Sequence, residues 1–226
     1  MNTPTEPAGI LLVDKPRGIT SFDVIRQLRR STGIRKMGHT GTLDPMATGL
    51  MVMLIGKATK RAAELVKLDK VYRAEVTLGA NSTTGDTEGE LAPVSSIKPS
   101  RKDVDTVCHS FIGNITQIPP QYSAIKINGV AAYKRMRRGE QVVIPARQVT
   151  IYDLQVLEYS YPKLTLQIHV SSGTYIRTLA QDIGAQLGTG AHLTALRRLT
   201  VGPYKIDNAL VLDGIDNTSL SAHLMK

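Results

Sequence analysis

The segment Thr48–Ile55 (TGLMVMLI) constrains this chain most, because it is apolar at nearly every position. A half-exposed strand alternates apolar and polar residues, whereas a continuous apolar run of this length is typical of a strand buried on both faces. Hydrophobic residues make up 42% of the 226 residues and aromatic residues only 4%, so the core must be aliphatic. The chain is therefore predicted to be globular and to contain a fully buried strand.

A helix is predicted before this strand, from Thr20 or Ser21 to about Arg30, because Thr20 and Asp23 have the spacing of a capping box. Further strands are expected at residues 9–13, 71–78, 115–118, 122–127 and 199–206, a hairpin at 148–158 and 163–170, and helices at 58–68, 100–111, 130–138 and 174–187. Strands outnumber helices and are often joined as hairpins. This pattern predicts an α+β fold with a mixed, largely antiparallel sheet and packed helices.

The organisation along the chain is predicted to be simple. Residues 1–8 form a polar tail, residues 9–208 one compact domain with an insertion at about 81–130, and residues 209–226 a short C-terminal tail. Residues 33–49 form a loop rich in glycine and threonine, and residues 81–93 a polar loop.

The charge of the chain points to a polyanionic partner. Lys and Arg number 28 against 19 Asp and Glu, a formal net charge of +9. The basic residues form an early cluster (Arg26, Arg29, Arg30, Arg35, Lys36), a middle cluster (Lys134, Arg135, Arg137, Arg138) and a late pair (Arg197, Arg198). Separated clusters suit a fold that gathers them around a phosphate backbone, although basic surfaces are often only solubilising.

Several classes of protein are disfavoured. The single cysteine, Cys108, excludes an intrachain disulfide framework, and neither a signal peptide nor an apolar run long enough for a membrane span is present. The Gly56-Lys57 pair lacks the glycine spacing and the Ser or Thr of a phosphate loop. No histidine pair has metal-ligand spacing. We expect a cytoplasmic protein without membrane or metal and without ATP-driven chemistry.

The loop GHTGTLDPMATG, residues 38–49, carries the most information. Its three glycines allow a ligand close to the backbone, and its one carboxylate, Asp44, precedes a proline. From the residues alone, Asp44 is readily explained as an Asx-turn residue or as a helix N-cap with proline at the first helical position. The functional alternative is a carboxylate nucleophile or base presented by a rigid loop.

This loop resembles the catalytic motif of the TruB family of tRNA pseudouridine synthases. The flanking segments agree over residues 10–200 and in the same order: DKPRGITS at 14–21, DKVYRAE at 69–75, STTGDTEG at 82–89, PPQYSAIK at 119–126 and GTYIRTL at 173–179. The resemblance implies the pseudouridine synthase catalytic fold.

The resemblance also implies residue roles. Asp44 corresponds to the catalytic aspartate, Tyr72 to the tyrosine that stacks on the target uracil, and Arg177 to the arginine that pairs with the aspartate and favours its ionised form. The positions that match the uridine pocket and its surroundings are His39, Tyr175, Leu196 and Lys15. Read without the family, Tyr72 is an ordinary strand aromatic, Leu196 a core residue and His39 a turn residue.

The implied reaction breaks the C1′–N1 bond of a uridine and rejoins the base through C5. It is an isomerisation that requires no cofactor and no metal. The implied substrate is the T-arm of tRNA, at position 55, and we expect a monomer without guide RNA and without the C-terminal PUA domain of many relatives. The alternatives are a non-catalytic RNA-binding module or tRNA chaperone, and a guide-RNA-dependent relative.

Overall fold

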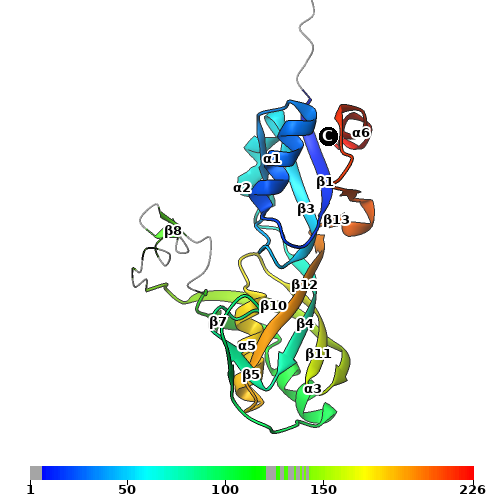
Figure 1. Ribbon diagram of the computed structural model, residues 1–226. Helices are drawn as coiled ribbons and strands as arrows, with labels where there is room; N and C mark the ends of the chain where they lie inside the picture. The colour runs from blue at the N-terminus through cyan, green and yellow to red at the C-terminus, as the bar shows by residue number, and fades with distance from the viewer. Residues whose placement is uncertain are drawn as a thin grey trace, which may run out of the picture. The chain divides into compact units, whose positions relative to one another are not determined.

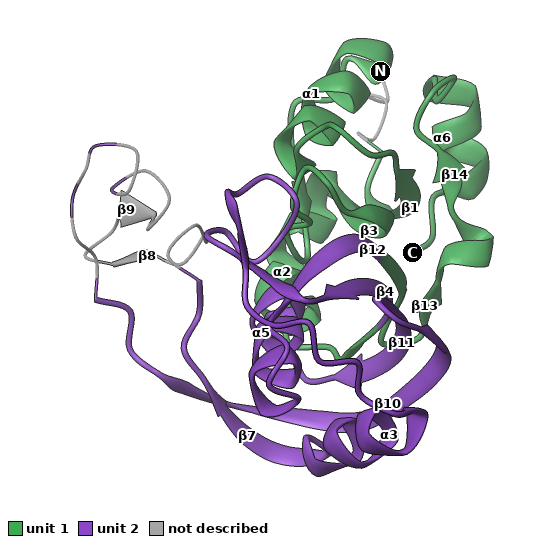
Figure 2. Ribbon diagram, turned by 60° about the horizontal axis from the view of Figure 1, so that its bottom comes forward, with its two compact units in different colours: residues 1–71, 197–226 green, residues 72–196 purple. Residues whose placement is uncertain are grey.

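The structure, a computed structural model, describes residues 7–120, 126, 127, 130, 131, 135, 138, 140 and 143–226. It divides into two compact units, whereas the sequence predicts one compact domain. Unit 1 consists of residues 1–71 and 197–226, and unit 2 of residues 72–196 (Figure 2). The chain thus leaves unit 1 after residue 71 and returns to it at residue 197.

The sheet of unit 1 is built around β3 (Thr48–Ile55), which is buried along almost its whole length as predicted. β1 (Gly9–Lys15) runs antiparallel beside it, and the end of β12 (Ala191–Val201) pairs with it in parallel through Arg197 and Arg198 (Figure 1). The remaining strands are β2 (Met37–His39) on β3, β14 (Leu210–Val211) on β1 and β13 (Tyr204–Lys205) on β12. The sheet of unit 1 is therefore mixed.

Helix α1 (Ser21–Thr32) has the predicted capping box between Thr20 and Asp23, and it ends at Gly33, whose φ of 73° is the left-handed conformation that glycine adopts most readily. The helix predicted at 58–68 is in fact a 3₁₀ helix η1 (Gly56–Arg61) that continues as the short α2 (Ala62–Leu65). The core beneath these elements is aliphatic, as predicted, and consists of Ile10, Leu12, Leu50, Val52, Leu54, Leu65 and Val201.

The C-terminal segment is folded, although the sequence predicts a tail at 209–226. After η2 (Ile206–Asn208) and β14, helix α6 (Asn217–His223) buries Leu220 completely. Met225 then exchanges two backbone hydrogen bonds with Ile10 of β1. A single buried leucine in a short polar helix gives too little apolar periodicity for the sequence to reveal it.

The sheet of unit 2 has the order β12-β4-β11-β10-β7. Its strands are β4 (Lys70–Leu78), β7 (Gly113–Gln117), β10 (Arg147–Ser160) and β11 (Lys163–Val170). β10 forms the predicted antiparallel hairpin with β11 and pairs with β7 on its other edge. With the helices below, this gives the predicted α+β class with a largely antiparallel sheet.

Two helices of unit 2 lie wholly within the described residues: α3 (Arg101–Ser110), capped by Ser100 as predicted, and α5 (Ile176–Gln186). The polar loop predicted at 81–93 contains a small hairpin of β5 (Ala80–Ser82) and β6 (Leu91–Pro93).

Two predictions fall largely on residues outside the described ranges. Only β8 (Lys126–Ile127) is described of the strand predicted at 122–127. The helix predicted at 130–138 is wrong for its first two residues, which form β9 (Val130–Ala131), and most of its remainder lies outside the described residues. The last strand is predicted at 199–206, but β12 begins at residue 191 and ends at residue 201. The adjacent Arg197 and Arg198 interrupt the apolar pattern of β12, so the sequence does not indicate where this strand begins.

Candidate active site

The Asp44 loop, residues 38–49, forms hydrogen bonds to residues 15–21 on both sides of Asp44. On one side, Ser21 Oγ accepts a hydrogen bond from Leu43 N (2.8 Å) and donates one to Leu43 O (3.1 Å). On the other side, Pro45 O accepts hydrogen bonds from Gly18 N (2.8 Å) and from Lys15 Nζ (3.3 Å). The backbone on either side of Asp44 is therefore held by the segment 15–21.

Asp44 itself is half-buried and begins a turn, because Ala47 N donates to Asp44 O at 3.1 Å. No helix follows Pro45: the chain enters β3 at Thr48. This geometry contradicts the helix N-cap interpretation of Asp44 and leaves the turn and the catalytic interpretations.

Cationic and titratable side chains surround this loop within unit 1. Lys15 is fully buried, and its pKa is lowered to about 8, mainly by burial. The Asp44 carboxylate opposes this shift, and the Arg198 cation adds to it. Burial and the Arg198 cation lower the pKa of His39, whose Nδ1 accepts a hydrogen bond from Gly41 N at 3.3 Å. Asp44 thus interacts with a buried lysine that also lies near the Arg198 cation.

Arg177, the second residue of α5, is 5% exposed and pairs with the equally buried Asp86 of unit 2, with 3.4 Å between Nη1 and Oδ2. Its Nη1 also donates to Thr84 O at 3.0 Å. Asp86 is held in turn by Thr84 Oγ1 (2.5 Å) and by Glu88 N (3.0 Å). Asp86 belongs to the motif at residues 82–89, but nothing in its residue type or spacing marks it as the partner of Arg177.

Tyr175 stands at the N-terminus of α5, where Gln117 fixes its backbone through hydrogen bonds of 3.0 and 3.3 Å. The guanidinium of Arg147 lies over its ring, 4.7 Å from the centroid. Tyr72 on β4 and Leu196 on β12 are each 8% exposed. Aromatic and aliphatic faces of this kind can hold a base that has left its stack.

The predicted site residues are thus divided between the units. In unit 1, Lys15 interacts with Asp44, and the Arg198 cation acts on both Lys15 and His39. Unit 2 contains Tyr72, Tyr175, Arg177 and Leu196. The contact of Asp44 with Tyr72 and Arg177 stays a prediction.

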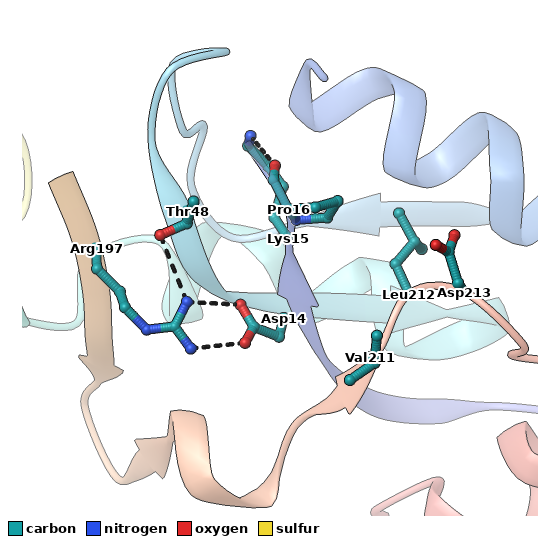
Figure 3. Close-up of a pocket in the computed structure, with 8 residues that line it drawn as sticks. All are labelled: Asp14, Lys15, Pro16, Thr48, Arg197, Val211, Leu212 and Asp213. Atoms are coloured by element: carbon teal, nitrogen blue, oxygen red, sulfur yellow. Dashed lines mark hydrogen bonds and ion pairs between the residues drawn. The ribbon is translucent and has the colours of Figure 1, made fainter. Parts of the chain in front are cut away.

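The late pair of basic residues is not a surface cluster. Arg198 is 1% exposed, so its predicted contact with a phosphate backbone is wrong. Arg197 lies on the opposite face of β12 and forms a two-point ion pair with Asp14 (2.6 and 3.1 Å) beside Thr48, in a shallow pocket of unit 1 (Figure 3). Successive side chains of a strand point to opposite faces, and the sequence does not say which of the two arginines is buried.

Lys70 is a second buried amine of unit 1, bound to Val66 O (2.8 Å) and Leu68 O, and burial lowers its pKa to about 8. In the unfolded chain Lys70 has the ordinary lysine pKa of 10.5. Between pH 8 and 10.5 the unfolded state therefore binds more protons than the folded state. We expect the free energy of unfolding of the wild type, relative to Lys70→Met, to rise from pH 8 to pH 10 in denaturant titrations. The exposed Lys67→Met is the matched control. A difference that does not change with pH would contradict the prediction.

Among the described residues, no group of His, Cys, Asp and Glu could hold a metal ion. No helix in the described ranges is long and apolar enough to cross a membrane.

Solved structures share this fold. The chain matches the archaeal box H/ACA sRNP Nop10–Cbf5 complex with a TM-score of 0.67 at 27% identity, over 90% of this chain and 51% of that one. It matches a Cbf5–Nop10–Gar1 complex with a TM-score of 0.73 at 27% identity, over 98% of this chain and 65% of that one. The chain therefore spans less than two thirds of each of these structures.

Two family models cover most of the sequence. Residues 29–176 match the N-terminal domain of the TruB family pseudouridylate synthases, and residues 177–223 match a C-terminal domain of tRNA pseudouridylate synthase B. The fold and the motif around Asp44 define a pseudouridylate synthase.

Relatives specify the family more narrowly. The tRNA pseudouridine synthase B of Syntrophotalea carbinolica is 47% identical over 92% of this chain and 68% of its own length. That of Corynebacterium efficiens is 48% identical over 99% of this chain and 77% of its own length. The chain belongs to the TruB family.

Proposed function

We propose that this chain converts the T-loop uridine of tRNA, at position 55, to pseudouridine. The observation that carries the proposal is the match to TruB family models from residue 29 to residue 223, which includes the Asp44 loop and Arg177. The substrate class is supported by relatives named tRNA pseudouridine synthase B at 44–48% identity. The reaction is an isomerisation: the C1′–N1 bond breaks, a C1′–C5 bond forms, the C5 proton leaves and N1 takes up a proton, so the composition of the nucleoside does not change.

In this proposal Asp44 is the catalytic carboxylate, Tyr72 stacks on the target base and Arg177 pairs with Asp44. His39, Tyr175, Leu196 and Lys15 line the uridine pocket. The interaction of Asp44 with the buried Lys15 supports the role of Asp44, because a nearby cation favours the ionised carboxylate that the reaction needs. The burial of Arg177 supports its pairing with Asp44, because a desolvated guanidinium interacts strongly with carboxylates.

The alternatives are a non-catalytic RNA-binding module and a guide-RNA-dependent relative. Binding alone requires no half-buried carboxylate beside a buried lysine, so the Asp44 loop disfavours the RNA-binding module. The second is suggested by the fold shared with Cbf5, but the named sequence relatives are tRNA pseudouridine synthases. Incubating the purified chain with an unmodified tRNA transcript and mapping pseudouridine decides. Pseudouridine at position 55, formed without guide RNA or partner proteins, supports the proposal. The absence of pseudouridine contradicts it. We further propose a cytoplasmic monomer, in keeping with its tRNA substrate.

Unit 1 provides most of the positive charge for RNA binding. It contains sixteen Lys and Arg against nine Asp and Glu, or +7 of the formal +9. The whole early cluster is exposed: Arg26, Arg29, Arg30, Arg35 and Lys36. These side chains suit the phosphate backbone of a single RNA arm.

We therefore expect this 226-residue chain to modify an isolated T-arm stem-loop nearly as well as whole tRNA. The competing expectation is that unit 2 holds another arm through Arg101 and Lys102. In the structure Arg101 contacts Asp105 and Val156 O, just as Arg26 of the early cluster pairs with Asp23, so these contacts do not distinguish the two expectations. Comparing kcat/KM for the two substrates decides: a hairpin worse by more than about a hundredfold, ~2.7 kcal/mol, contradicts the single-arm prediction. Binding to either substrate is expected to weaken steeply as salt rises, because each phosphate contact releases counterions.

A further inference from the structure

We propose that Arg198 is a positioning residue of the active site: its guanidinium joins Gly41, inside the Asp44 loop, to Leu50, directly after the loop, and so holds the carboxylate in place. This inference rests on the proposed catalytic role of Asp44. Arg198 itself does not touch the substrate in this proposal. It acts through the loop.

The geometry of the guanidinium supports this role. Arg198 Nε donates to Leu50 O at 2.7 Å, and Arg198 Nη2 donates to Gly41 O at 3.1 Å. Gly41 and Leu50 lie on either side of Asp44 in the chain. One planar side chain therefore bridges the backbone before Asp44 and the backbone after it, which a lysine with a single ammonium cannot do with the same geometry.

Two glycines of the loop make room for this bridge. A Cβ on Gly49 would lie 2.4 Å from Arg198 O and 2.7 Å from Arg198 N, and Gly49 has a φ of +104°. A Cβ on Gly41 would lie 3.3 Å from Arg198 Nη1. The strand β12 can thus approach β3 closely at the register pair Arg198–Gly49. The glycines of the family motif serve this approach as well as the ligand.

The burial of a permanent cation needs an explanation beyond packing. Arg198 is among the largest fully buried side chains, and an arginine stays charged in a protein. Replacing a buried ionic group with a well-packed apolar one is often neutral or stabilising, so stability alone does not require arginine here. The titratable groups of unit 1 that Arg198 acts on are Lys15, His39 and Lys70, and Asp44 and Asp23 act in turn on Lys15. Arg198 is the permanent cation among these groups, and it lowers the pKa of all three.

Arg198→Met and Arg198→Lys test the proposal, with kcat, KM and the pH dependence of kcat measured on unmodified tRNA. In Arg198→Met we expect kcat to fall by at least about 30-fold with KM changed less than about threefold, because misplacement of a reacting group by about 1 Å can cost 100-fold. The acid limb of the kcat profile should move to higher pH, since a cation near Asp44 is lost. Arg198→Lys should restore the acid limb but not the full kcat.

A second readout does not depend on activity. Hydrogen exchange of peptides spanning residues 41–50 should be at least about tenfold faster in both variants, because local opening of the loop then requires less free energy. Leu220→Ala in α6 is the matched control: it destabilises unit 1 without touching the loop, and its kcat below the melting temperature and its exchange at 41–50 should stay near wild type. If Arg198→Met does not fold, Arg198→Lys carries the test alone.

The outcomes separate this inference from the proposed function. A wild type that forms no pseudouridine contradicts the proposed function, and exchange at 41–50 still reports whether Arg198 holds the loop. Unchanged loop exchange, or a kcat within about threefold of wild type in folded variants, overturns the positioning role. A kcat loss matched by Leu220→Ala at an equal loss of stability, with the acid limb unmoved, also overturns it.

Discussion

Asp44→Asn is expected to abolish pseudouridine formation while lowering tRNA affinity by less than about tenfold. Asparagine has nearly the same shape, so the loop contacts through Leu43 and Pro45 stay in place. It cannot ionise, and therefore removes the anion on which the proposed chemistry depends. Most of the affinity comes from phosphate contacts to exposed basic residues, which the substitution does not alter. Product formation and filter binding are measured on the same preparations.

Asp207→Asn is the matched control for this experiment. Asp207 is an exposed carboxylate of unit 1 in η2, so its substitution makes the same change in net charge without touching the Asp44 loop. We expect its activity to equal that of the wild type. Substantial turnover by Asp44→Asn would remove Asp44 from the catalytic role and leave only its place in the turn.

Arg177→Lys is expected to lose rate by at least about 100-fold in kcat/KM while the protein stays folded. Lysine keeps the charge but lacks the planar fork with which a guanidinium can hold several acceptors at once. In the structure this fork already binds the Asp86 carboxylate and Thr84 O. A single ammonium cannot keep these partners and also pair with Asp44 as proposed.

Thermal unfolding and tRNA binding accompany the kinetics of this variant. A melting temperature near that of the wild type, together with slow turnover, assigns Arg177 to the reaction. Wild-type rates in Arg177→Lys would instead mean that Arg177 has only a structural role, the ion pair with Asp86.

Local patterns in the sequence predicted those elements whose cause is local. The continuous apolar run of β3, the capping boxes at Thr20 and Ser100 and the paired strands β10 and β11 all follow from neighbours close in the chain. The candidate catalytic carboxylate, Asp44, was found by resemblance to a family motif, because its residue type and loop alone favoured a turn or a cap. Elements with weak periodicity, such as α6, were missed.

The tertiary structure decided what depends on residues far apart in sequence. It placed Arg198 in the core and Arg197 in an ion pair with Asp14, although the two are neighbours of the same type. It also paired Arg177 with Asp86, which precedes it by 91 positions. Residue type and spacing set the helices and strands, but the partner of a buried charge is set by the packing of distant elements. The free energy of desolvating a cation is offset only where that packing supplies its acceptors.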